Sequence, residues 1–218
     1  HVHPEHDLGA TAFPADSVMI RSRAQLEEIA ETGLRVADEF RLRSAEYADL
    51  LDGARFRDAD IVFDEALELD LGGVHVRLRA MGPDHTPGDT VALVVEDGVL
   101  FSGDVAMLLP PSFASVRSSL RHWLASLDEL EAMHPQVIVP SHGPTGGVEL
   151  IEAYRRYLRE VLRLSRAARR EGKSAEQAVA EIVPQLIDGQ PDAARIAGAV
   201  RVAYREAGPA DEEAGEQR

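Results

Sequence analysis

The chain has 218 residues, 23 of them basic and 38 acidic, which gives a formal net charge of −15 with the histidines neutral. A chain of this length can bury a hydrophobic core as one large or two small domains, whereas its negative charge would repel a nucleic-acid backbone. It contains no cysteine, so it has neither disulfides nor thiolate metal ligands. No apolar run reaches membrane-spanning length. Together these features are typical of a soluble globular enzyme without a nucleic-acid or membrane partner.

The first six residues, His1-Val-His3-Pro-Glu5-His6, carry three histidines and a glutamate. If this segment is extended, its side chains alternate in direction, so His1, His3 and Glu5 would project to one side and His6 would lie at the following turn. Imidazole and carboxylate groups are the ligands that suit zinc and its neighbours in the first transition row. A histidine-rich tag or solvated terminus is the alternative, and three later segments argue against it.

The first half of the chain predicts two helices separated by a short strand, followed by three more strands. Apolar residues at near-helical spacing favour a long helix over residues 23–51, which Gly33 can bend or divide. Gly72-Gly73 indicates a hairpin turn between two strands. The expected elements are a helix over 7–13, a strand over 17–20, the helix over 23–51, and strands over 61–63, 66–71 and 74–80.

In the second half, a mixed segment is followed by a wholly helical one. Ser174 is a suitable N-cap for one of the last helices, and Gly172 and Gly189 separate them. The residues from 208 to 218 are acidic and predict a disordered tail. The expected elements are strands over 91–95 and 99–102, a loop over 109–112, a helix over 119–133, a strand over 136–139, and helices over 149–171, 174–187 and 191–207.

Three downstream motifs place further ligand-type residues at loops and strand ends. Gly82-Pro-Asp-His85-Thr-Pro-Gly88 puts His85 in a loop rich in glycine and proline. Leu100-Phe-Ser-Gly103-Asp104 puts Asp104 at the end of an apolar strand, and Val137-Ile-Val-Pro140-Ser-His142-Gly143-Pro144 does the same for His142. Loop residues at strand ends can converge on one edge of a sheet, so a shared site is expected.

Together the four motifs resemble those of the metallo-β-lactamase superfamily, whose first motif is usually written HxHxDH. The resemblance covers residues 1 to about 146, and the order of the motifs matches. It implies a layered α/β fold, an αββα sandwich, with a metal-binding domain over residues 1–147, and the helical pattern that follows predicts an extension over 148–207. Mixed hairpins and helices are themselves typical of a layered α/β architecture.

The sequence departs from the family pattern in two ways. Glu5 stands where most members have aspartate, and the chain begins at the first motif, without Met and without the strands that precede this motif in the family. We therefore expect a chain that is incomplete at its N-terminus. Such a chain would expose a sheet edge and apolar surface.

The resemblance also implies a division of labour within the site. His1, His3 and His85 would hold one metal ion, Glu5, His6 and His142 would hold a second, and Asp104 would bridge them; Asp104 and Glu5 are the candidate catalytic residues. Two zinc ions are expected, with iron or manganese as alternatives. Thr86, Asp89 and Ser141 sit beside these residues and could fix the tautomers of the histidines, although each could equally satisfy backbone groups of its own loop.

The implied activity is metal-dependent hydrolysis, in which a metal-bound hydroxide attacks a carbonyl ester, thioester, lactone or amide of a small molecule. Asp104 as the bridge resembles the glyoxalase II and lactonase branches and not the lactamases that carry cysteine there. The alternative is a non-catalytic metal-binding protein or an inactive fragment of such a hydrolase. The sequence leaves the oligomeric state open and favours the cytoplasm only slightly.

Overall fold

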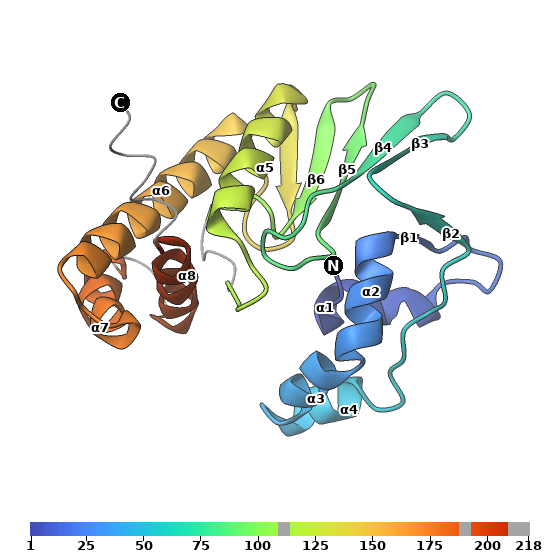
Figure 1. Ribbon diagram of the computed structural model, residues 1–218. Helices are drawn as coiled ribbons and strands as arrows, with labels where there is room; N and C mark the ends of the chain where they lie inside the picture. The colour runs from blue at the N-terminus through green and yellow to red at the C-terminus, as the bar shows by residue number, and fades with distance from the viewer. Residues whose placement is uncertain (109–113, 188–192, 209–218) are drawn as a thin grey trace.

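The computed structural model describes residues 1–108, 114–187 and 193–208, and a five-stranded sheet forms its centre (Figure 1). The strands are ordered β3-β4-β5-β6-β7, and neighbours are antiparallel except for the parallel pair β6 and β7. The expected α/β class is confirmed. The strands are β3 (Ala66–Asp70), β4 (His75–Ala80), β5 (Thr90–Val94), β6 (Val99–Gly103) and β7 (Val137–Pro140).

Four helices lie on one side of the sheet, where the first two pack side by side and the last two pack on the second (Figure 1). The first is the crossover between the two parallel strands, a connection that parallel pairing requires. Ser119 caps it by accepting a hydrogen bond from the backbone N–H of His122, and Ser174 with Gln177 forms the predicted cap as a capping box. The helices are α5 (Leu120–Ala132), α6 (Val148–Arg170), α7 (Ala175–Leu186) and α8 (Ala193–Glu206).

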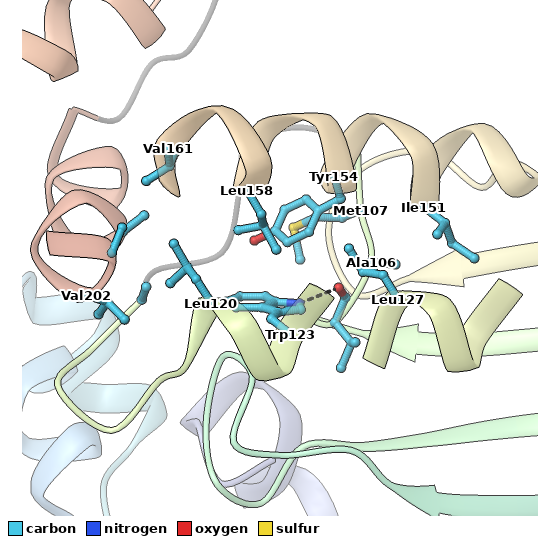
Figure 2. Packing of buried hydrophobic residues seen from close by; sticks show 14 of the residues in the cluster. Ala106, Met107, Leu120, Trp123, Leu127, Ile151, Tyr154, Leu158, Val161 and Val202 are labelled. Carbon is cyan, nitrogen blue, oxygen red and sulfur yellow. Dashed lines mark hydrogen bonds between the residues drawn. The ribbon is translucent and has the colours of Figure 1, made fainter. Parts of the chain in front are cut away.

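The main hydrophobic core lies between the sheet and these helices (Figure 2). Trp123 of α5 is fully buried, its indole N–H donates to the Val105 carbonyl at 2.8 Å, and its ring centroid lies 5.2 Å from that of Tyr154 on α6. The same core continues to Val200 on α8. The domain boundary expected after residue 147 stays a prediction.

The opposite face of the sheet is also apolar, but in the described part of the chain no second sheet covers it. Phe101 is 48% exposed and Val137 is 39% exposed on this face. Apolar side chains on both faces are typical of strands that are buried on both sides. By pairing register, the face consists of Leu67, Leu69, Val76, Leu78, Ala92, Val94, Val99, Phe101, Val137 and Val139.

The N-terminal third forms a separate group of short elements around a two-stranded parallel sheet. The single helix expected over residues 23–51 is wrong: Gly33, at φ +51°, ends the first helix, and two shorter helices follow. The strand expected over 17–20 instead pairs as Ile20–Ser22 with Ile61–Phe63. The elements are α1 (Pro4–Asp7), a 3-10 helix (Leu8–Ala12), β1 (Ile20–Ser22), α2 (Arg23–Thr32), α3 (Arg35–Arg41), α4 (Ala45–Leu50) and β2 (Ile61–Phe63).

The remaining predicted strands and helices match within a few residues at their ends. The Gly72-Gly73 hairpin is confirmed, with φ values of +85° and +101° that favour glycine. The predicted loop over 109–112 and the predicted acidic tail, apart from Gly208, lie outside the described residues. No helix in the described ranges is both long and apolar enough to cross a membrane.

Candidate metal centre

The N-terminal segment turns back after His3, and this brings His6 beside His1. The His3 carbonyl accepts hydrogen bonds from the backbone N–H groups of His6 at 3.0 Å and Asp7 at 3.1 Å. The ring centroids of His1 and His6 are 4.0 Å apart. The extended arrangement expected for residues 1–6 is therefore wrong beyond His3, because Pro4 starts a helical turn at the position where proline is favoured.

Asp7 anchors this turn to the N-terminal sheet. Its carboxylate is buried and forms a two-pronged ion pair with Arg21 of β1, with 2.7 Å between Asp7 Oδ1 and Arg21 Nη2. Arg21 also donates to the Arg57 carbonyl at 3.1 Å. A buried charge pair needs such additional hydrogen bonds to offset desolvation. The pair fixes the end of α1 next to the histidines.

His85 lies in the loop between β4 and β5, residues 82–89, which we call the His85 loop. His85 is 3% exposed. The segment that leads into α5 holds this loop from one side: the Ser118 hydroxyl donates to the His85 carbonyl at 2.8 Å, and the Ser119 N–H donates to the Pro83 carbonyl at 3.0 Å. The backbone at His85 is thereby tied to a helix of the main core.

Asp104 and His142 follow the two parallel strands β6 and β7. Because parallel neighbours end at the same edge of a sheet, the two side chains come together there. Asp104 is 4% exposed and its Oδ1 accepts a short hydrogen bond from the Ser141 hydroxyl, while the Ser141 N–H donates to the Gly103 carbonyl at 3.1 Å. Ser141 thus orients the Asp104 carboxylate, whereas the sequence had suggested it as a partner of a histidine.

All seven predicted side chains converge at this edge. His85 Nε2 lies 3.2 Å from His3 Nδ1 and 3.4 Å from Asp104 Oδ2. Asp104 Oδ1 lies 3.5 Å from His6 Nε2 and 3.7 Å from His142 Nε2. Three groups have donor atoms that all lie within 4.8 Å of one another, namely His1, His3 and His85, then His1, His6 and Asp104, and then Glu5, His6 and His142.

Burial favours the neutral imidazole form of His3 and His6. Burial, followed by the neighbouring His85, lowers the pKa of His3 to about 3. Burial also lowers the pKa of His6 to about 4, against the opposing effect of Asp104. Burial alone would raise the pKa of Asp104, but His85, His6, the Ser141 hydroxyl and His142 together hold it below its ordinary value. Neutral imidazole and ionised carboxylate are the metal-binding forms.

The cluster fits a metal ion better than it fits a set of hydrogen bonds. Within the described structure, Nε2 of His1 and Nε2 of His6 are buried and have no hydrogen-bond partner. Buried polar atoms without partners cost free energy unless something else satisfies them. Imidazole nitrogens with carboxylate oxygens are the donor set of zinc and of iron or manganese, and the chain has no thiolate to add.

The expected grouping of the ligands matches the observed proximity of their side chains, and their roles as ligands stay predictions. His142 and Glu5 lie at the open side of the cluster, since the His142 side chain is 36% exposed and Glu5 is exposed. The sequence suggested Thr86 and Asp89 as partners of the histidines. Both residues are buried, and Asp89 Oδ1 lies 3.6 Å from His1 Nδ1.

Sequence reasoning missed two buried carboxylates near the centre. Glu28 of α2 is 4% exposed and accepts from the Gly88 N–H at 3.0 Å. Asp84 is fully buried and accepts hydrogen bonds at 2.9 Å from Ser126 and from His122. Glu28 carried no signal, because it is one of several glutamates in a helical segment. Asp84 stands next to His85 in the motif and could have been suspected from that position.

Comparison with known proteins agrees with this geometry. The chain is 27% identical over 200 residues to a linear primary-alkylsulfatase of Pseudomonas sp. (strain ATCC 19151), covering 77% of this chain and 36% of that protein. It is 29% identical over 96 residues to a type 2 metallo-beta-lactamase of Bacteroides fragilis, covering 41% of this chain and 38% of that protein. It thus spans well under half the length of these curated relatives.

Among solved structures, a beta-lactamase domain protein from Burkholderia ambifaria has a similar fold, with a TM-score of 0.65 at 24% identity over 93% of this chain and 65% of that one. The family model described as metallo-beta-lactamase superfamily matches residues 1–142, the range that contains every side chain of the cluster. With the fold, the converging motifs and this match in agreement, the chain belongs to the metallo-beta-lactamase superfamily.

Proposed function

We propose that this chain is a metal-dependent hydrolase whose centre holds two zinc-like ions. The observation that carries the proposal is the convergence of six nitrogen- or oxygen-donor groups around the buried Asp104 carboxylate. His1, His3 and His85 would hold the first ion, Glu5, His6 and His142 the second, and Asp104 would contact both. When bound, such ions lower the pKa of a coordinated water and polarise a substrate oxygen.

The protein's own groups have separable tasks in this proposal. The neutral imidazoles of His3 and His6 offer lone pairs because burial disfavours their protonation. Ser141 holds the Asp104 carboxylate in one orientation. Glu5 lies at the exposed side beside His6 and His142, where its carboxylate could accept a proton. The chain would thus need no serine or cysteine nucleophile.

The substrate is proposed to be an ester or a related hydrolysable bond in a small molecule. Carbonyl esters, thioesters, lactones and amides follow from the family resemblance. The similarity to the alkylsulfatase covers 77% of this chain, more than residues 1–142 of the family match, and this adds alkyl sulfate esters as a second candidate class. In each case water is added across the bond, which gives an acid together with an alcohol, thiol or amine; in a cyclic substrate such as a lactone both groups remain in one molecule.

The test is hydrolysis of a panel by the purified chain in three states: as isolated, treated with a chelator, and refilled with zinc. The panel contains an aryl ester, a thioester, a lactone, a β-lactam and a primary alkyl sulfate. We expect turnover of at least one class, its loss with chelator and its return with zinc. Metal binding without any turnover would favour the non-catalytic alternative, and the absence of metal binding after zinc supplementation would overturn the proposal.

A further inference from the structure

Glu28 is a buried carboxylate that joins α2 to the His85 loop. Its Oε2 accepts a hydrogen bond from the Gly88 N–H at 3.0 Å, and it is also hydrogen-bonded to the Thr86 side chain. Burial raises the pKa of Glu28, while these two hydrogen bonds oppose the rise. A buried carboxylate in a helix is costly unless its partners are well placed. Both of these hydrogen bonds come from residues of one loop.

The contact between α2 and the loop is close enough to require glycine. A Cβ added to Gly88 would lie 2.8 Å from Glu28 Oε2 and 3.0 Å from Gln25 Cα. The second of these neighbours is helix backbone, which cannot move aside as a side chain could. The helix therefore packs directly on the loop backbone, and the carboxylate of Glu28 reaches an N–H that a larger residue at position 88 would cover.

Residues of the same loop connect Glu28 to two histidines of the metal centre. The Thr86 N–H donates to Asp89 Oδ2 at 2.9 Å, and the Thr86 hydroxyl oxygen lies 3.2 Å from Asp89 Oδ1. Asp89 in turn lies 3.6 Å from His1 Nδ1. His85 is the residue that precedes Thr86. The position of Thr86 therefore affects the position of His85, through the backbone, and that of His1, through Asp89.

Arg117 adds a second connection from the other side of the loop. Its Nη1 lies 3.8 Å from Glu28 Oε1, and its Nη2 lies 2.8 Å from Glu31. The next residue, Ser118, donates its hydroxyl to the His85 carbonyl at 2.8 Å. Helix α2 and the segment before α5 thus hold the His85 loop between them. The Glu28 carboxylate of α2 lies close to both the loop and Arg117 of that segment.

We propose that Glu28 is a positioning residue for the metal centre, which holds the His85 loop in the conformation that presents His85 and His1 to one ion. This inference rests on the proposed function for its metal-binding consequence, whereas the ordering of the loop does not depend on metal. Groups that orient metal ligands change metal affinity by about 10–100-fold when removed.

The test measures two properties of purified full-chain variants. The first is the dissociation constant of the tighter Zn²⁺ site, by competition with a chromophoric chelator. The second is amide hydrogen exchange of Thr86 and Gly88 in the metal-free protein. The variants are Glu28→Ala and Glu28→Gln, the latter keeping an acceptor for the Gly88 N–H. Glu27→Gln is the exposed control on the same helix, and Leu158→Ala is a destabilised control in the distant helical core.

We expect Glu28→Ala to raise the dissociation constant about 10–100-fold and to speed exchange at both amides, Glu28→Gln to do so less, and neither control to do so. Unchanged affinity and exchange in Glu28→Ala, or equal weakening in Leu158→Ala, would overturn the inference. If Glu28→Ala does not fold, the comparison of Glu28→Gln with Glu27→Gln decides. If the unmodified chain binds no zinc, the proposed function fails, and exchange alone decides the role of Glu28.

Discussion

The metal centre and the helical core both contain buried side chains, but these are of opposite kinds. The centre contains buried ionisable residues such as His85 and Asp104, each held by a hydrogen bond from a serine more than 30 positions away in the sequence. The core contains aliphatic residues such as Leu158 and Val200, both fully buried. Burial in the core stabilises the fold, whereas burial in the centre sets protonation and geometry. Substitutions in the two regions should therefore have separable effects.

The largest expected effect is on activity, from Asp104→Ala. This change removes the carboxylate that lies within 3.5 Å of both His6 and His85, so we expect turnover of any substrate found to fall by several orders of magnitude and bound zinc to decrease. The thermal melting of the chelated protein should change little. Asp97→Asn, at an exposed hairpin turn, is the matched control. Near-normal activity in the Asp104 variant would show that this carboxylate does not contact the ions.

Asp7→Ala should have the largest effect on stability. It leaves Arg21, which is 1% exposed, as a buried charge without its carboxylate, and breaking such a pair costs about 3–5 kcal/mol. Asp64→Ala breaks an exposed ion pair with Arg23 and should cost far less, because solvent screens that pair. Urea unfolding of both variants measures the difference. Equal losses would mean that burial of the Asp7 pair contributes nothing.

Leu158→Ala should lower stability without changing the metal centre. The side chain is fully buried in α6, and Leu→Ala changes in cores cost about 2–5 kcal/mol. Zinc affinity measured below the melting transition should equal that of the unmodified chain. A loss of affinity in this variant would break the proposed separation of the two regions, since among the described residues the ligand groups and this core share no member.

The most gradual effect should be a loss of stability of the metal-free chain in acid. The pKa values of His3 and His6 are about 3 and about 4 in the folded chain, below about 6.5 in the unfolded chain. Between these values the unfolded state binds more protons, so the free energy of unfolding should fall as pH drops below about 6.5.

This pH effect is measured by urea unfolding of chelated protein between pH 8 and pH 4. The variant His3→Gln should show a shallower decline, because it removes one of the two depressed groups. His134→Asn, at an exposed site with φ +52° that asparagine tolerates, is the control and should match the unmodified chain. A flat profile over this range would contradict the lowered pKa values of His3 and His6.

Local structure could be predicted where it depends on residues that are adjacent in the sequence. The hairpin at Gly72-Gly73, the cap at Ser174 and the placement of Asp104 and His142 after apolar strands depend on neighbours in sequence, and the structure agrees. The helix over 23–51 was mispredicted because favourable helix formers outweighed Gly33 in the pattern. The N-terminal strand was misplaced because a three-residue strand is defined by its partner, Ile61–Phe63, and not by its own periodicity.

The sequence by itself determined which residues could form the centre, since histidines and carboxylates are metal-binding side chains and Gly- and Pro-rich strand ends can bring them together. Only the tertiary structure decided how they meet: the turn at Pro4 that pairs His6 with His1, the burial that lowers the pKa of His3, and the contact of Glu28 with Gly88 across 60 positions of the chain. Contacts between side chains, their burial and their charge state depend on neighbours from distant segments of the chain. The sequence alone does not show which segments those are.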